Sequence, residues 1–354
     1  MAYTTVNKST DYFNTSLWSG NSSTQTITGV GFQPDLVWLK QRSSTQAHAL
    51  YDAIRGVTKY IASNTDGAEG TQAQGLTAFN SDGYALGTDE MNNATGQTYV
   101  GWNWKANGAG SSNTDGSITS TVSANTTAGF SVVTYTGAGG NVTVGHGLGV
   151  VPKIILIKRL DSANSWIMYN KIIGHSSYFV LNTNAAKASS STFFNATSPT
   201  SSVFTVGNDA GVNGGSNTYV AYCFADITGY SSFGQYGGNA NSDGTFVYTG
   251  FKPAWLVVKR EDSTDNWYMK DSIRSGSGNP NGSNPIQTEH PSCNSNAAEN
   301  KASAFGVDFL SNGFKIRGSD SGINGNDGNP YYYVYMCFAQ APLVGSNDVP
   351  CIAR

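Results

Sequence analysis

Enzymes that activate a nucleophile usually place a histidine beside it, because imidazole exchanges protons near neutral pH. The 354-residue sequence has four histidines: His48, His146, His175 and His290. His48 aligns with a tryptophan in two related segments of the chain, which favours a packing role. His146 and His175 lie beside glycines in expected turns, and His290 lies in an expected insertion. Because no GxSxG or HExxH motif accompanies them, these residues predict no nucleophilic or zinc-dependent catalysis.

Two acid–base pairs repeat at a spacing of three residues, namely Asp52 with Arg55 and Asp271 with Arg274. A third related segment has Asn170 and Ile173 at these positions. A catalytic site copied and then half lost would be unusual, so we expect structural ion pairs on short turns. Glycosidases need two carboxyl groups in one cleft, and we identify no other acidic position that repeats in two segments. We therefore expect no enzyme.

Metal sites are not expected either. Four Asn-Ser/Thr-Asp-Gly tetrads occur at residues 64–67, 80–83, 113–116 and 241–244. They lack the further carboxylates of a calcium loop, whereas Asp-Gly is a strong hairpin signal. The four cysteines, Cys223, Cys293, Cys337 and Cys351, form no CxxC pair for zinc. We predict no metal and no other cofactor.

The composition excludes further classes of protein. Charged residues are 12% of the chain and the net charge is −3, so the electrostatic attraction that nucleic-acid binding needs is weak. No apolar run approaches the roughly 18 residues of a membrane span, and the first residues lack the features of a signal peptide. We expect a soluble, unprocessed protein that binds no nucleic acid and enters no membrane.

The chain contains three copies of one unit. A proline, a variable residue, four apolar residues and a lysine recur at residues 34–40 (PDLVWLK), 152–158 (PKIILIK) and 253–259 (PAWLVVK). Each run fits a strand that starts at proline and is buried on both faces. A closing segment recurs at residues 98–104 (TYVGWNW), 218–224 (TYVAYCF) and 332–338 (YYVYMCF). Its alternate residues predict one core-facing side.

Between these landmarks the copies align in three columns that we expect in the core. The columns are His48, Trp166 and Trp267; Leu50, Met168 and Met269; and Ile54, Ile172 and Ile273. A strand ending in an aromatic, a hydroxyl and a glycine also precedes each proline. These endings are Trp18-Ser19-Gly20, Tyr135-Thr136-Gly137 and Tyr248-Thr249-Gly250.

Short β-branched and aromatic strands between glycine-rich turns predict an all-β fold. We expect three tandem β-sandwich modules, jelly-roll or lectin-like, at residues 1–107, 108–228 and 229–343, followed by a C-terminal tail at 344–354. Residues 106–127 are mostly Gly, Ser, Thr, Asn and Ala, which favours a linker. The third module carries an insertion near residues 276–300, where we expect a loop.

Surface aromatic residues are the best candidates for recognition. Aromatic residues make up 12% of the chain, and beside Asn, Asp and Gly they are typical of surfaces that bind sugars. We expect most tryptophans in the cores. The surface candidates are Tyr331 and Tyr332, together with Asn324, Asn326 and Asp327 of the 324–329 loop.

Several segments together carry a family resemblance. They are AYTTV (2–6), DYFNT (11–15), GVGFQPD (29–35), WNWK (102–105), GHGLG (145–149), FVYTGF (246–251), FAQAP (338–342) and IAR (352–354). With them the chain resembles marine bacteriophage structural proteins described as tail-fibre-like. The resemblance covers nearly the whole chain. It implies repeated β-sandwich adhesion modules on a virion surface, and it offers no catalytic motif.

We therefore expect a bacteriophage virion structural protein, a tail-fibre or spike-like adhesin that contacts a glycan or outer-membrane protein of the host cell. The alternative is a capsid-decoration or fibre-shaft protein that binds other virion subunits. A polysaccharide depolymerase is less favoured, because it needs paired carboxyl groups. A homo-oligomer, such as a trimer, would multiply weak contacts. The expected location is the virion surface, after synthesis in the host cytoplasm.

Overall fold

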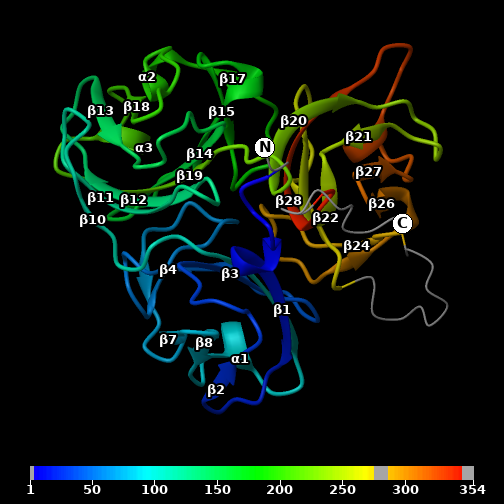
Figure 1. The fold of residues 1–354 in the computed structure, drawn as a ribbon, viewed down its shortest axis with the longest axis horizontal. Coiled ribbons are helices and arrows are strands. Elements are labelled where there is room, and N and C mark those ends of the chain that lie inside the picture. Colours follow the sequence, from blue (N-terminus) through cyan, green and yellow to red (C-terminus); the bar gives the residue numbers. More distant parts are fainter. Residues whose placement is uncertain (1–3, 275–285, 345–354) are drawn as a thin grey trace.

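The structure, a computed structural model, describes residues 4–274 and 286–344. Most of its regular elements are β-strands in antiparallel sheets, which confirms the predicted all-β fold. The helices within these two ranges are all too short or too polar to cross a membrane. In Figure 1 three lobes, one for each repeated unit, lie around a common centre.

Each unit has a main sheet with the same strand order, in which the closing strand lies between the first strand and the proline strand. In the first unit the order is β1 (Phe13–Ser19), β9 (Thr98–Trp104), β3 (Leu36–Gln41) and β4 (Ala49–Asp52). In the second unit it is β12 (Phe130–Thr136), β19 (Thr218–Phe224), β14 (Ile154–Arg159) and β15 (Ile167–Asn170). In the third unit it is β20 (Ser231–Gly237), β28 (Tyr332–Pro342), β22 (Phe251–Arg260) and β23 (Tyr268–Asp271). One topology at all three prolines confirms the predicted repeat.

A smaller sheet covers the outer face of each main sheet, so each unit is a β-sandwich. The small sheets are β2 (Gln25–Ile27), β8 (Gly83–Leu86) and β7 (Leu76–Asn80); β13 (Val142–Gly145) and β18 (Val203–Val206); and β21 (Phe246–Tyr248), β27 (Gly313–Ile316) and β26 (Val307–Leu310). In the first unit, Tyr84 and Leu86 of the small sheet pack with Leu39 and Tyr99 of the main sheet.

Short elements complete the fold. The remaining strands are β5 (Lys59–Tyr60) and β6 (Gly70–Thr71), β16 (Ser177–Val180) and β17 (Ala188–Ser189), and β24 (Glu289–His290) and β25 (Asn300–Lys301). The 3-10 helices are η1 (Ser9–Asp11), η2 (Lys171–Ile173) and η3 (Ser303–Phe305). The α-helices are single turns: α1 (Glu90–Asn93), α2 (Ser191–Phe194), α3 (Ala210–Asn213) and α4 (Ser321–Asn324).

The linker predicted at residues 106–127 is wrong. This stretch contains β10 (Ser111–Asn113) and β11 (Ser120–Asn125), which extend the second main sheet beside β12. Such polar residues can form strands because ladder hydrogen bonds use backbone groups. The loop predicted near residues 276–300 lies partly outside the described residues, and its described part contains β24. The tail predicted at 344–354 lies outside them except for its first residue.

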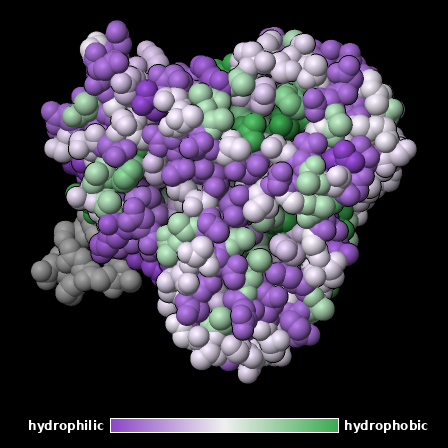
Figure 2. All heavy atoms as spheres, turned by 180° about the vertical axis from the view of Figure 1, so that it is seen from behind, coloured by the Kyte–Doolittle hydropathy of each residue, from purple (hydrophilic) through white to green (hydrophobic). Residues whose placement is uncertain are grey.

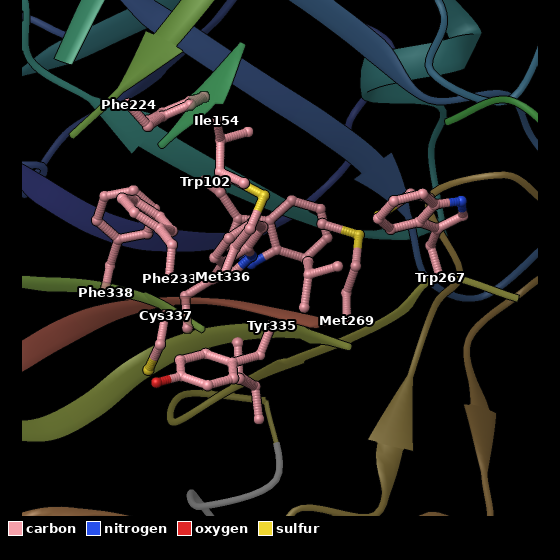
Figure 3. Close-up of a cluster of buried hydrophobic side chains, with 14 of the residues drawn as sticks. Trp102, Ile154, Phe224, Phe233, Trp267, Met269, Tyr335, Met336, Cys337 and Phe338 are labelled. Atoms are coloured by element: carbon pink, nitrogen blue, oxygen red, sulfur yellow. The ribbon is translucent and has the colours of Figure 1, made fainter. Parts of the chain in front are cut away.

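The inner faces of the three main sheets meet in one hydrophobic core. Alternate residues of each closing strand point into it: Trp102 and Trp104, Tyr222 and Phe224, and Met336 and Phe338. The ring centroids of Trp104 and Phe338, and those of Phe224 and Phe338, are 5.8 Å apart. Figure 3 shows side chains from all three units converging there. Because they share this core, the units form one body rather than separate modules along a chain.

Neighbouring units meet along seams that repeat the same backbone hydrogen bonds. One set of N–H groups donates to carbonyls of the next unit, with N···O distances of 2.8 Å: Glu69 to Leu160, Lys187 to Glu261, and Glu299 to Arg42. A second set, also at 2.8 Å, runs from Gln46 to Asn296, from Asn164 to Asp66, and from Asp265 to Asn184. The bonded positions are equivalent in the repeat. The chain therefore closes into a ring with approximate threefold symmetry.

Two of the three predicted core columns are buried. The columns that begin with His48 and Leu50 are at most 1% exposed in every unit. The third prediction is wrong, because Ile172 is 37% exposed and Ile273 is 38% exposed, while Ile54 is half-buried. These isoleucines lie in the turns after β15, β23 and β4, beyond the last strand of each four-strand set.

The predicted alignment of Tyr248 is also wrong. Trp18 stacks on Tyr99, and Tyr135 stacks on Tyr219. In the third unit the residue that stacks on the closing strand is Tyr236, whose ring centroid lies 5.0 Å from that of Tyr333. Tyr248 instead lies in β21 of the small sheet and is 58% exposed. The pattern of an aromatic, a hydroxyl and a glycine therefore identified β21 instead of β20. A sequence pattern of this kind does not show which strand pairs with the closing strand.

Candidate functional site

The five predicted recognition residues differ in their exposure to solvent. Tyr332 is 51% exposed and Asp327 is exposed, while Asn326 is half-buried. Tyr331 is half-buried beneath Arg260, whose guanidinium carbon lies 3.6 Å from the ring centroid. Asn324 is fully buried, so its prediction as a surface residue is wrong. Four of the five therefore lie at or near the surface of the third unit.

Asn324 is buried because it belongs to a repeated structural motif that the sequence analysis missed. Its side-chain amide donates to the Gly318 and Asn241 carbonyls at 2.8 and 2.7 Å, and its oxygen accepts from the Asn239 N–H at 2.9 Å. Asn93 and Asn213 make the corresponding bonds in the other units. The signal is Gly-x-Asp-x-x-x-Asn, which begins at residues 87, 207 and 318. The interpretation that no acidic position other than that of Asp52 and Asp271 repeats is therefore wrong, because the aspartate of this motif recurs in all three units, where it caps a one-turn helix.

The predicted ion pairs are structural, and they lie in the seams. Asp52 and Arg55 are buried with a contact of 2.5 Å, and Asp271 pairs with Arg274 in the same way. The Tyr222 hydroxyl of the second unit donates to Asp52 at 2.8 Å. These groups therefore hold two units together rather than face a substrate.

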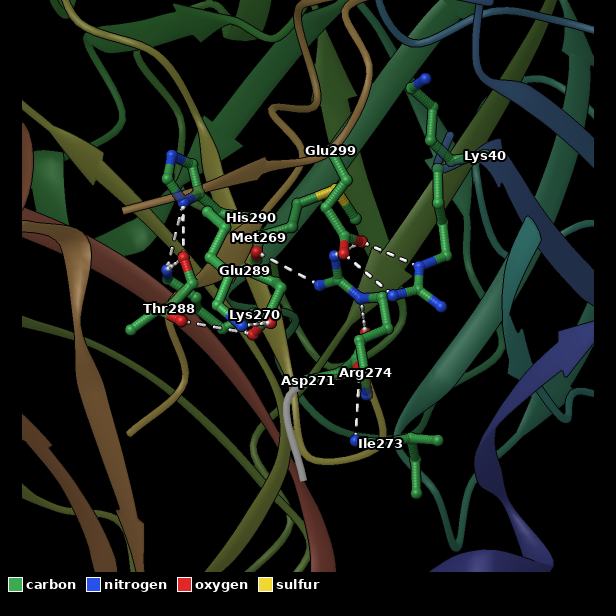
Figure 4. Close-up of polar contacts among 12 residues, drawn as sticks. Lys40, Met269, Lys270, Asp271, Ile273, Arg274, Thr288, Glu289, His290 and Glu299 are labelled. Atoms are coloured by element: carbon green, nitrogen blue, oxygen red, sulfur yellow. Dashed lines mark hydrogen bonds and ion pairs between the residues drawn. The ribbon is translucent and has the colours of Figure 1, made fainter. Parts of the chain in front are cut away.

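The seam between the third and first units adds a second carboxylate. Trp102 donates its indole N–H to Asp271 at 3.0 Å, and Arg274 lies between Asp271 and Glu299 (Figure 4). Burial alone would raise the pKa of Glu299, but Arg274 and Arg42 hold that pKa below its usual value. Every charge of this cluster is thus compensated.

The histidines occupy packing or turn positions. His48 is buried, its Nδ1 accepts from the Trp38 indole at 2.8 Å, and its Nε2 lies 3.0 Å from the Ser292 carbonyl across a seam. Burial lowers the pKa of His48 to about 3, so the ring stays neutral at physiological pH. In residues 4–274 and 286–344, no group of three or more His, Cys, Asp or Glu side chains is arranged to hold a metal ion.

An open groove of about 540 Å³ lies where the first and second units meet. Its walls carry five threonines: Thr119, Thr121, Thr134, Thr136 and Thr218. β11 and β12 place Thr121 opposite Thr134, and β12 and β19 place Thr136 opposite Thr218. These threonine hydroxyls make no hydrogen bond with any described residue, so they are free to bind a ligand.

The groove depends on strands that only the second unit has. β10 and β11 extend its main sheet beyond β12. The counterparts of β12 in the other units, β1 and β20, end their sheets within the described ranges. The extension continues the inner face of the sheet past the hydrophobic core, and this part of the face forms the groove.

The charged residues of the groove are already paired. Arg55 bonds Asp52 and Glu69, and Asp161 accepts from Arg159 at 2.7 Å. Ile54 and Leu160 contribute apolar surface. The groove therefore presents hydroxyl and methyl groups with little unpaired charge, and these suit a neutral, hydroxyl-rich ligand.

Comparison with curated proteins gave no match. Comparison with protein families gave one match, described as a domain of unknown function (DUF7483), over residues 8–342. This range contains all three units and both walls of the groove. The chain therefore belongs to the DUF7483 family, whose domain comprises the whole three-unit ring.

Proposed function

We propose that this protein is a surface-recognition protein without catalytic activity, a tail-fibre or spike-like adhesin of a bacteriophage virion that binds a neutral glycan on the host cell. The observation that carries the proposal is the threonine-lined groove between the first and second units. The placement on a virion rests on the resemblance of the sequence to tail-fibre-like proteins.

The side chains of the groove match the chemistry of a sugar. A sugar ring presents hydroxyl groups around its rim and C–H groups on its faces. Threonine offers a hydroxyl that donates and accepts hydrogen bonds and a methyl group for apolar contact. Ile54 and Leu160 add further apolar surface. A neutral glycan would satisfy the free hydroxyls without meeting an unpaired charge.

The groove is also preorganised. Thr121, Thr134 and Thr218 lie on strands of one continuous sheet, and their backbone positions are fixed by ladder hydrogen bonds. A rigid surface loses little conformational entropy on binding. On the face that Figure 2 presents, hydrophobic residues form only small areas among polar ones. A glycan-binding surface of this kind would stay exposed to solvent.

The proposal is tested by removing the hydroxyls without changing shape. We expect the Thr134→Val/Thr136→Val/Thr218→Val variant to lose at least tenfold in binding to host cells and to neutral oligosaccharides on a glycan array, because valine keeps the volume and cannot hydrogen-bond. Thr98→Val is the matched control, since Thr98 begins β9 as Thr218 begins β19. Equal binding by the wild type and the triple variant would contradict the groove as the binding site.

The virion location needs a separate test. We expect labelled antibody against this protein to decorate the tail in electron micrographs of intact particles. Label on the capsid shell would contradict the tail-fibre proposal and favour a capsid-decoration protein. One chain forms the groove from its own first and second units, so the glycan-binding test does not depend on whether the chain forms a homo-oligomer.

A further inference from the structure

Strand β21 presents two aromatic rings to solvent. Phe246 is 43% exposed and Tyr248 is 58% exposed, while Val247 between them is buried. Alternate residues of a strand point to the same face, so both rings lie on the outer face of the small sheet. Their attachment points are about 7 Å apart along the strand. We call this pair the aromatic platform.

The other two units show that the fold does not require these rings. Val247 pairs with Phe314 as Ile27 pairs with Tyr84 and Val144 with Phe204. The residues that flank Ile27 are Thr26 and Thr28, and those that flank Val144 are Thr143 and Gly145. Small or polar residues therefore serve at the same outer-face positions, and the third unit alone carries exposed aromatic rings there.

Polar side chains surround the platform. Lys315 lies opposite Phe246 on β27 and pairs with Asp243 at 2.7 Å. Arg317 bonds both Asp243 and Asp308. Two cations and two carboxylates thus balance each other beside the rings and offer fixed donors and acceptors. Gly313, which has no side chain, lies opposite Tyr248 on β27.

We propose that the aromatic platform is a second carbohydrate-binding site, which stacks two rings of a neutral oligosaccharide on Phe246 and Tyr248. The inference rests on the proposed recognition of glycans but uses a different surface. Strand β21 of the platform lies on the third unit, away from β11 and β12 (Figure 1), which contribute residues to the groove. Aromatic faces attract the C–H face of a sugar, and the ion pairs beside them bond its hydroxyls. Two sites on one rigid body would bind a long glycan with avidity.

Other occupants fit the platform less well. A stable protein interface buries about 1,200–2,000 Å² in total, whereas an aromatic side chain buries only about 150–250 Å², so two rings are too few for a protein partner. A nucleic acid would also stack on aromatic rings, but the balanced charges and the net charge of −3 give its phosphates no attraction.

The other units supply the variant that tests this. Phe246→Thr/Tyr248→Thr gives the third unit the residues that flank Ile27 in the first, so the melting temperature should not fall. We expect this variant to lose at least tenfold in binding to the neutral oligosaccharides that the wild type binds on a glycan array. Phe246→Tyr is the conservative control and should retain binding, since a tyrosine ring still stacks.

Each outcome decides the proposal. Wild-type affinity of the double variant for every glycan, or no neutral glycan bound by the wild type, would overturn it. Loss of binding in the groove triple variant alone would leave the groove as the binding site and remove the platform. Loss of glycan binding in the platform variant alone would leave the platform as the binding site and remove the groove. If the wild type self-associates in sedimentation and the double variant does not, the platform is a contact between copies and the proposal is wrong.

Discussion

At each seam, a few side chains determine how two units fit. Asp52 and Arg55 both form hydrogen bonds with the Tyr222 hydroxyl of the next unit. In the second unit, Asn170 and Ile173 occupy the positions of Asp52 and Arg55. In the third unit, Met336 occupies the position of Tyr222. Met336 belongs to the shared hydrophobic core, and Ile173 packs against that core. The sequence predicted the ion pairs but not their partners, because the partner lies in another unit. A polar cluster thus joins the first and second units, whereas Met336 and Ile173 of the equivalent positions lie in and against the shared hydrophobic core.

This pairing predicts an order of stabilities. Arg55→Met leaves the buried Asp52 carboxylate without its cation, which should lower the free energy of unfolding by about 3–5 kcal/mol. Asp52→Asn/Arg55→Ile reproduces the second unit and should cost less, because no unpaired charge remains buried. Urea unfolding at pH 7 would measure both variants. If the double variant were as unstable as Arg55→Met, the unpaired charge of Asp52 would not be the cause of the lost stability.

Three equivalent lysines predict a dependence of stability on pH. Lys40, Lys158 and Lys259 are at most 1% exposed, and their ammonium groups bond only carbonyls in the described ranges. Burial lowers the pKa of each to about 8, against about 10.4 in an unfolded chain. Between these values the unfolded chain binds more protons, so the contribution of each lysine to stability rises with pH.

Lys158→Met isolates one of these contributions. The difference in unfolding free energy between the wild type and this variant should rise in favour of the wild type from pH 7.5 to 9.5. The comparison cancels the buried tyrosines and cysteines, which titrate in both proteins. Urea titrations at several pH values would measure the difference. A difference that stays constant with pH would show that Lys158 keeps its ordinary pKa.

At the scale of elements, the sequence predicted the strands that bury side chains and missed those that do not. The runs at Pro34, Pro152 and Pro253 and the closing segments carried a clear hydrophobic pattern. β10 and β11 were missed, because residues 106–127 hold few apolar side chains and pair through the backbone. The groove was therefore not predictable, since its outer wall is β11. Tyr248 was aligned with Trp18 and Tyr135, where the structure has Tyr236, because the sequence does not show which strand pairs with the closing strand.

The repeated Gly-x-Asp-x-x-x-Asn motif fixes each one-turn helix against its small sheet. In the second unit, Asn213 bonds the Gly207 and Gly140 carbonyls and the Ala138 N–H. Asn213→Ala leaves these groups without partners, and each buried orphan costs about 1–3 kcal/mol. We expect a loss of about 3 kcal/mol or more in chemical denaturation. The exposed Asn141→Ala should change stability by less than about 0.5 kcal/mol, and a similar cost for both would contradict the structural role of the motif.

At the scale of the molecule, the ring explains why one chain builds a groove between units. The first and second units are held in register by equivalent backbone hydrogen bonds and by the shared core. The sequence predicted three units but placed them in tandem, because a repeat in sequence does not reveal which faces of the units meet. Closure of the ring buries the inner faces that separate modules would expose to water.

Native-state hydrogen exchange of a Trp255→Ala variant tests the shared core most directly. Trp255 lies in the third unit, and its ring centroid is 5.4 Å from that of Trp104 in the first unit. Truncation should remove about 3–5 kcal/mol and speed the exchange of the most protected amides in β9 and β19 as much as in β22. Faster exchange confined to the third unit would show that the units unfold independently and would contradict the single body.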